Sequence, residues 1–139
     1  MKRILAFDVG DKRIGVAVSA ALGITAQPVE TYHRKGGAEK DAEYLLSLAR
    51  KYSPCMLLFG LPRNMDGTYG EQAEKVKRFA QRVLDNWDGE HAFYDERLTT
   101  MAARRVLLDA DISREKRKQV IDKMAAVVIL QGYMESHRG

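Results

Sequence analysis

Three acidic residues, far apart in the chain, occupy positions from which carboxylates can act on a common ligand. Asp8 ends an apolar run that begins at residue 3, and strand alternation places it on the same face as Ile4 and Ala6. A carboxylate at the inner end of a buried strand needs a cation nearby, because an ion without a partner is costly to desolvate. The alternative is a solvated Asp in a turn before Gly10.

The second acidic position is the pair Asp95-Glu96, at the end of a predicted strand over residues 91–96. Ligands in open α/β sheets gather beyond the carboxyl ends of the strands, so adjacent parallel strands would bring this pair close to Asp8. Neighbouring strand residues point to opposite faces, so only one of the pair is expected to reach a shared site. We choose Glu96, which is nearer the strand end and has the longer side chain. The alternative is that Asp95 helps to cap the next helix while Glu96 pairs with Arg97.

The third acidic position is Asp122, within a predicted helix over residues 116–134. Helical spacing places it on one face with Ala125, Ala126, Ile129 and Tyr133. This apolar stripe should face the sheet, where a carboxylate needs a cation. The helix dipole near the start of the helix helps to keep the group ionised. An exposed Asp stabilised by that dipole alone is the alternative.

Three carboxylates brought together without a metal would repel one another, and at least one would take up a proton. Mg²⁺ or Mn²⁺ would convert them into an oxygen-only site for hard cations. Two such ions, about 3.5–4 Å apart, activate a water and stabilise the leaving oxygen in phosphodiester hydrolysis. The predicted metal ligands and catalytic residues are therefore Asp8, Glu96 and Asp122.

Basic residues near these positions indicate a polyanionic substrate. The net charge is +4, and a cluster in segment 113–119 directly precedes Asp122. Arg117 and Lys118 of this cluster are predicted to attract phosphates, although a solvated helix start explains the pattern equally well. Weaker candidates for substrate binding lie in the loops beside the predicted strand ends: Lys12, Arg13, Arg63, Asn64 and Arg97. Three alternatives remain open. Lys12 and Arg13 would lie in a solvated turn, Asn64 would only shape its turn, and Arg97 would pair with Glu96.

The pattern of elements that must position these residues predicts an α/β fold. Three strands with short links favour antiparallel pairing, and helices then alternate with two further strands. The fifth strand is followed by a predicted helix from Thr99 or Thr100 to about Leu108. We expect one domain over residues 1–139, with a mixed five-stranded sheet flanked by helices. The predicted strands are 3–9, 13–20, 24–33, 55–59 and 91–96, and the other helices end near Pro54, Trp87 and Met134.

Composition limits the functional classes. With 45% hydrophobic and 30% charged residues, the chain has a globular balance, and its longest apolar stretch is too short to cross a bilayer. The start of the chain does not resemble a cleavable signal peptide. The single Cys55 lies in an apolar strand, which favours a reducing cytoplasmic setting, and the three histidines have no zinc-like spacing.

Four segments together resemble the YqgF/RuvX family, the Holliday-junction-resolvase-like proteins that are also described as pre-16S rRNA nucleases. The likeness implies a ribonuclease-H-like fold, a cytoplasmic location and a role in ribosome maturation, with Asp8, Glu96 and Asp122 at the positions of the family's acidic cluster. Asp11 stands where the family more often has an uncharged residue, and either an outer carboxylate or a weakened phosphate contact would follow. The segments are 8–17, 60–67, 95–100 and 116–126.

The leading hypothesis is thus a nuclease that processes the 5′ end of pre-16S rRNA, acting on RNA alone or on ribosomal particles, as a monomer or a homodimer. Residue types do not separate RNA from branched DNA, so a Holliday-junction resolvase is the second hypothesis; it would need a two-fold dimer. A non-catalytic nucleic-acid or ribosome-binding factor is the third, but loss of a carboxylate would be its signature. An actin-like ATPase needs two such domains, and the chain has room for one.

Overall fold

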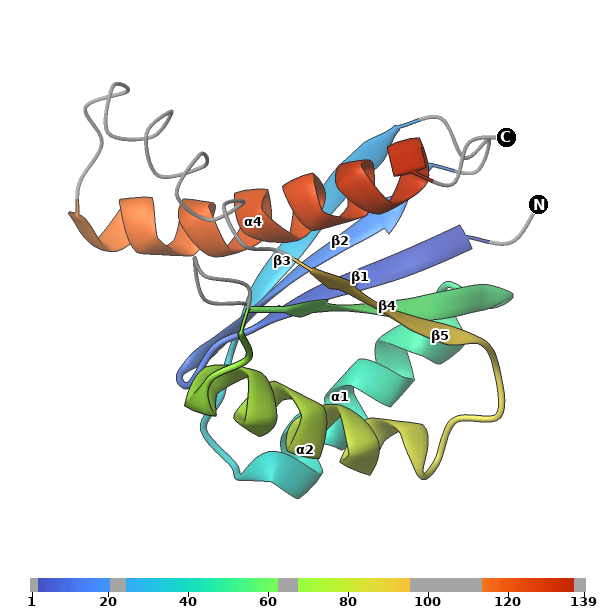
Figure 1. The fold of residues 1–139 in the computed structure, drawn as a ribbon, viewed down its shortest axis with the longest axis horizontal. Helices are drawn as coiled ribbons and strands as arrows, with labels where there is room; N and C mark the ends of the chain where they lie inside the picture. The colour runs from blue at the N-terminus through green and yellow to red at the C-terminus, as the bar shows by residue number, and fades with distance from the viewer. Residues whose placement is uncertain (1–2, 21–24, 63–67, 96–113, 137–139) are drawn as a thin grey trace.

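The computed structural model describes residues 3–20, 25–62, 68–95 and 114–136, with Asp95 and residues 114–123 described by their backbone alone. Five strands form one sheet, and helices cover both of its faces (Figure 1). The strands are β1 (Arg3–Val9), β2 (Arg13–Ser19), β3 (Ala26–His33), β4 (Cys55–Leu61) and β5 (His91–Asp95). The expected mixed five-stranded sheet is therefore confirmed, with boundaries close to the predicted ones.

The order of strands across the sheet is β3-β2-β1-β4-β5. β1, β2 and β3 pair antiparallel, as their short links predicted, whereas β1–β4 and β4–β5 are parallel pairs. The expected adjacency of the strands that carry Asp8 and Asp95 is wrong, because β4 lies between them. Their carboxyl ends still meet at one edge of the sheet, since β1, β4 and β5 all run in the same direction.

Two helices cover one face of the sheet and a long helix crosses the other (Figure 1). α1 (Ala38–Lys51) and α2 (Glu71–Leu84) share the first face, and α4 (Arg114–Ser136) extends two residues beyond its predicted range at each end. The helix predicted between Thr99 or Thr100 and Leu108 lies outside the described residues. Among the described helices, none is long and apolar enough to span a bilayer.

Large side chains fill the face covered by α1 and α2. Leu5, Phe7 and Val9 point to this side of β1, as the alternation predicted, and pack against buried residues of both helices. The rings of Phe7 and Phe59 lie 5.4 Å apart at their centroids, within the range of favourable aromatic contacts. Cys55 is also buried here, with its Sγ 3.4 Å from the carbonyl of Ala49, and it acts as a small apolar residue.

Small side chains line the opposite face, beneath α4. Ala6, Ala17 and Leu58 form a compact cluster with buried residues of α4. At Gly132 a Cβ would overlap the ring of Tyr94, so the helix backbone passes close to β5 only because this position has no side chain. The sheet therefore presents a face of short side chains on which a single helix lies closely.

Candidate active site

Asp8 lies on the α4 side of the sheet, at the carboxyl end of β1. It is half-buried, and its neighbours Phe7 and Val9 are buried on the opposite face. Its partner on β2 is Gly15. On β4, Phe7 pairs with Phe59, so the next residue along each strand brings Asp8 beside Gly60. Both strand positions that flank the carboxylate therefore lack a side chain.

Residues paired side by side across the sheet form a row, and the row that contains Asp8 extends through β4 to the outer strand β5. Gly60 pairs with Tyr94 of β5, and Tyr94 packs in the cluster beneath α4. Phe93 turns to the other face, where its ring lies 5.8 Å from that of Phe59. The described side chains of β5 thus alternate between the two faces. Glu96 lies outside the described residues, as do the predicted substrate-binding residues Arg63, Asn64 and Arg97.

Helix α4 begins at the end of the molecule where β1 ends (Figure 1). Ala125, Ala126 and Ile129 are fully buried, so the described part of the predicted apolar stripe faces the sheet. The hydroxyl of Tyr133, further along α4, lies 3.9 Å from Sδ of Met56 on β4. Met56 pairs with Ile4, so this later part of α4 lies over the row of Ile4.

The side chains of Asp122, Arg117 and Lys118 are not among those described, although all three positions belong to α4. Of the three predicted metal ligands, only Asp8 has a described side chain. Accordingly, the described side chains contain no group of three potential ligands. Grouping of the three carboxylates stays a prediction.

The turn after β1 carries Lys12, which is exposed, and Arg13, which is half-buried. The amide of Gly10 donates to the carbonyl of Arg13 at 2.8 Å and closes this turn. Asp11 is exposed, and its carboxylate lies 3.7 Å from Nζ of Lys75 on α2. An exposed pair at this distance contributes little to stability, but it shows that Asp11 interacts with the α2 side of the sheet.

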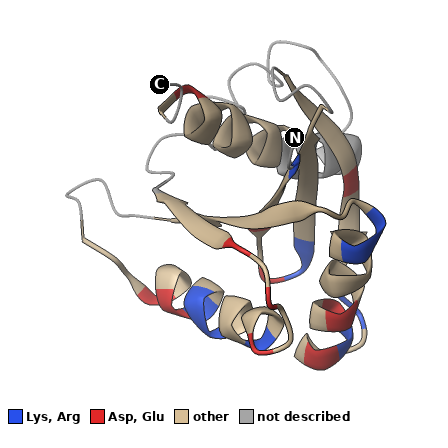
Figure 2. Ribbon diagram, turned by 90° about the vertical axis from the view of Figure 1, so that its right-hand side faces the viewer, with Lys and Arg blue, Asp and Glu red and all other residues tan. Residues whose placement is uncertain are grey.

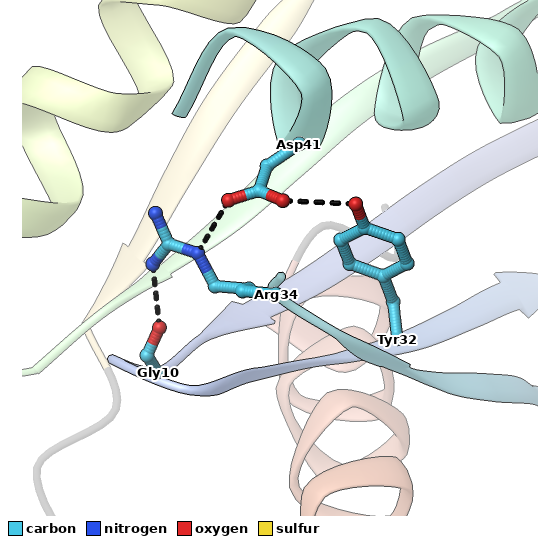
Figure 3. A network of polar contacts seen from close by, with 4 residues as sticks. All are labelled: Gly10, Tyr32, Arg34 and Asp41. Carbon is cyan, nitrogen blue, oxygen red and sulfur yellow. Dashed lines mark hydrogen bonds and ion pairs between the residues drawn. The ribbon is translucent and has the colours of Figure 1, made fainter. Parts of the chain in front are cut away.

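A network of polar contacts around the buried Asp41 holds the same turn from the other side (Figure 3). Arg34 donates from Nε to Asp41 at 2.8 Å and from Nη1 to the carbonyl of Gly10 at 2.7 Å. Tyr32 donates its hydroxyl to the second oxygen of Asp41, also at 2.8 Å. Asp41 is only 1% exposed, so its charge is stabilised by these partners. Burial, followed by the contact with Asp41, raises the pKa of the Tyr32 phenol.

Sequence reasoning missed this network, although one signal was present. Asp41 lies on the stripe of α1 that includes Ala42, Leu45 and Leu48, all of them buried. An acidic residue on an apolar stripe was the pattern that singled out Asp122. The same pattern at Asp41 indicates a buried carboxylate whose partner is a structural arginine.

Comparison with known families decides where this arrangement belongs. The family model described as "RuvX: Holliday junction resolvase" matches residues 2–136. The chain belongs to the RuvX family. The predicted membership is confirmed, and the family match spans the turn after β1, the end of β4, the end of β5 and α4, where the four motif segments lie.

Relatives within the RuvX family match over nearly the whole chain. Proteins from Desulforamulus reducens and Clostridioides difficile are 52% and 51% identical, each over 96% of this chain and over 97% and 94% of their own lengths. A protein from Clostridium novyi is 48% identical over 96% of this chain and 98% of its own. All three carry the name "Putative pre-16S rRNA nuclease", which agrees with the predicted class of enzyme.

A solved structure shares the fold at much lower sequence identity. Thermus thermophilus RuvC, in complex with a Holliday junction substrate, superposes with a TM-score of 0.56 and covers 99% of this chain and 97% of its own, at 16% identity. The predicted ribonuclease-H-like fold is thereby confirmed for this member of the RuvX family.

Proposed function

We propose that the chain is a Mg²⁺- or Mn²⁺-dependent endonuclease that processes the 5′ end of pre-16S rRNA, with Asp8, Glu96 and Asp122 as catalytic metal ligands. The observation that carries the proposal is the position of Asp8. Its carboxylate stands at the edge of the sheet, on the face covered by α4, between two glycines that leave the neighbouring strand positions without side chains. A metal ion that retains water molecules needs such room beside its ligand.

Packing of α4 supports a role for Asp122. Tyr133 contacts the row of Ile4, and Ala126 and Ile129 share a cluster with Ala6, two residues further along β1. Each step towards the start of α4 therefore advances towards the end of β1. Position 122 is one helical turn before Ala126 on the same stripe, so the progression leads to the row of Asp8.

Alternation supports Glu96 over Asp95. On β5, Ala92 and Tyr94 face α4, and Phe93 faces the other helices. Continuing this alternation assigns position 96 to the face that carries Asp8. Only β4 lies between β1 and β5, and its residue in the row of Asp8 is Gly60. No side chain of β4 therefore stands between Asp8 and β5 in that row.

The proposed chemistry assigns each group a separate task. The ions, two in number as we propose, supply an activated water and stabilise the leaving oxygen when bound. The three carboxylates would hold these ions at the carboxyl end of β1. Neighbouring phosphates of the substrate would be bound by Lys12, Arg13, Arg63, Asn64 and Arg97. Arg117 and Lys118 extend the phosphate contacts along the start of α4, so one helix links backbone binding to the ligand Asp122.

The names of the relatives favour pre-16S rRNA as the substrate, and we place the enzyme in the cytoplasm, where it acts on precursor rRNA or ribosomal particles. Branched DNA is the second candidate, because the family model is described as a Holliday junction resolvase and RuvC was solved with a Holliday junction. Symmetrical cutting of a junction requires a two-fold dimer, whereas a monomer is sufficient to process one end of an RNA.

The test is a cleavage assay of the purified protein on a pre-16S rRNA fragment and, separately, on a synthetic four-way DNA junction. We expect the RNA to be cut in Mg²⁺ or Mn²⁺ and to remain intact in Ca²⁺, whose longer bonds and looser geometry misplace the attacking water. Full cleavage in excess chelator would exclude metal catalysis. Cleavage of the junction alone, by a dimer, would replace the first substrate with the second.

A further inference from the structure

A basic cleft lies on the face of the sheet opposite Asp8, between α2 and the end of β1. Its volume is about 350 Å³, and Val9 and Gly10 form part of its lining. The cationic side chains that line it, Arg34, Lys75, Arg78 and Arg82, define the basic cleft. Figure 2 shows the Lys and Arg positions of α2 in blue, following the acidic first turn.

The charge of the basic cleft is strongly one-sided. Lys75, Arg78 and Arg82 follow one another at spacings of three and four residues, so they form one stripe of α2. Asp11 is the one acidic side chain among the described lining residues. With Asp41, which pairs with Arg34, four cations and two carboxylates leave an excess of two positive charges among the described residues around the cleft.

Arg34 pairs with Asp41, but the cations that α2 contributes are poorly compensated within the described part of the chain. Arg78 and Arg82 make no ion pair there, and Lys75 has only the 3.7 Å contact with Asp11. Like charges gathered on one wall repel one another. A bound anion would remove this repulsion and make charge-assisted hydrogen bonds to several guanidinium groups.

Arg34 gives the basic cleft a fixed cation opposite the exposed stripe of α2. Two of its donors are held by Asp41 and by the carbonyl of Gly10, and its guanidinium lies 4.7 Å from the ring centroid of Phe79. The side chain is 19% exposed, so the group remains accessible. Such a preorganised guanidinium loses little conformational entropy when it binds a phosphate.

The lining also indicates which part of a nucleic acid fits. Phe79 is only 5% exposed beneath Arg34, so it offers no open ring on which a base can stack. Apart from Asp11, the accessible charged groups are cations, which recognise phosphates without reading sequence. The chemistry of the basic cleft therefore matches a backbone phosphate.

We propose that the basic cleft binds a backbone phosphate of the RNA strand that extends from the carboxylate site. The inference rests on the proposed function for the identity of the polyanion. Val9 and Gly10 line the cleft and directly follow Asp8, which faces the other side of β1. A strand that passes over this edge of the sheet contacts the carboxylate on one side and the basic cleft on the other.

The test compares two double variants with the same change in charge. Lys75→Gln with Arg78→Gln removes two cations of the basic cleft, and Lys77→Gln with Arg50→Gln removes one lysine and one arginine outside it. All four side chains are exposed, so both variants should fold, and thermal unfolding checks this. Binding of a labelled pre-16S rRNA fragment is titrated across salt concentrations in an Asp8→Asn background, which prevents cleavage.

We expect the slope of log affinity against log salt to fall by roughly 0.7–0.9 unit for the cleft variant, because the cleft holds one phosphate and each lost phosphate contact removes that much. The control variant should keep the slope of the Asp8→Asn parent. Equal slopes for all three proteins, or an equal fall in both variants, would overturn the inference.

Two further measurements separate the possible failures. Inorganic phosphate is added during thermal unfolding of the parent and the cleft variant; stabilisation of the parent alone, with unchanged RNA slopes, would assign the cleft to a free anion and overturn the RNA assignment. Cleavage with wild-type carboxylates tests the proposed function separately. A slope change without any cleavage would support RNA binding by the basic cleft and contradict the proposed nuclease activity. Cleavage with unchanged slopes would support the nuclease activity and contradict RNA binding by the cleft.

Discussion

The two faces of the sheet are built in different ways. The face beneath α1 and α2 has large buried side chains, including Phe7 and Phe59, which hold two helices through extensive apolar packing. The face beneath α4 has Ala6 and Ala17 in its interior, with glycines on either side of Asp8. Burial of large apolar side chains supplies stability, whereas short side chains supply close approach and space. One face thus provides most of the core, and the other positions the proposed chemistry.

The largest expected effect separates the chemistry of the α4 face from its packing. Asp8→Asn replaces a carboxylate with an amide of nearly equal size, so the metal loses a charged ligand while the packing persists. We expect cleavage to fall by about a thousandfold or more, as loss of several kcal/mol of transition-state stabilisation implies. Single-turnover cleavage and thermal unfolding measure the two effects. A variant that cuts at the wild-type rate would place the active site elsewhere.

A matched pair on β4 tests the comparison directly. Leu57 and Leu58 are both fully buried, but they face α1 and α2 in one case and α4 in the other. Each change to Ala should lower the free energy of unfolding by about 2–5 kcal/mol. Only Leu58→Ala should also slow cleavage per folded molecule, by up to about a hundredfold, because it weakens the packing of α4 on the sheet. Urea unfolding and active-site titration supply the numbers, and equal activity of the two folded variants would contradict the division of roles.

A smaller effect concerns the basic start of α4. Changing Arg117 and Lys118 to Ala should weaken RNA binding in a salt-dependent way, and the slope of log affinity against log salt should drop by roughly one unit per lost phosphate contact. The measurement is a salt titration with wild type and variant side by side. Identical slopes would mean that these residues form a solvated helix surface and that RNA is held by other groups.

The smallest expected effect lies on the α1 and α2 side. Tyr32→Phe removes the hydrogen bond to Asp41 and should cost about 1 kcal/mol at neutral pH. The pKa of Tyr32 is raised in the folded protein, so the folded state keeps the phenolic proton longer than the unfolded chain does. This stabilisation is complete below about pH 10 and is lost as the pH rises through the folded pKa. Urea unfolding over that range should show the two proteins converging at alkaline pH; a constant difference would be inconsistent with this account.

Much of the α4 face followed from periodicity. The period of two along β1 assigned Asp8 to the face of Ala6, and the helical period placed position 122 on a buried stripe of α4. Both are local patterns that a sequence displays directly. The position of β4 between β1 and β5 was missed, because strand order depends on contacts between distant segments, which no local pattern encodes.

The basic cleft and the position of Arg34 in it could not be predicted from the sequence either. The spacing of Lys75, Arg78 and Arg82 indicates the polar face of a helix, but spacing does not say what stands opposite an exposed face. Arg34 lies between β3 and α1, and its partners are Asp41 of α1 and Gly10 in the turn after β1. Their meeting is a property of the folded chain.

The packing of α4 on a surface of short side chains also sets the order in which the protein becomes active during synthesis. The ribosome makes all five strands and the helices α1 and α2 before it makes α4. Until residues 114–136 have emerged and docked, Ala6, Ala17 and Leu58 stay exposed to water. Asp8 is by then already in the chain, but the proposed site still lacks Asp122. A nascent chain would thus be unable to cut RNA until its last described helix has been added.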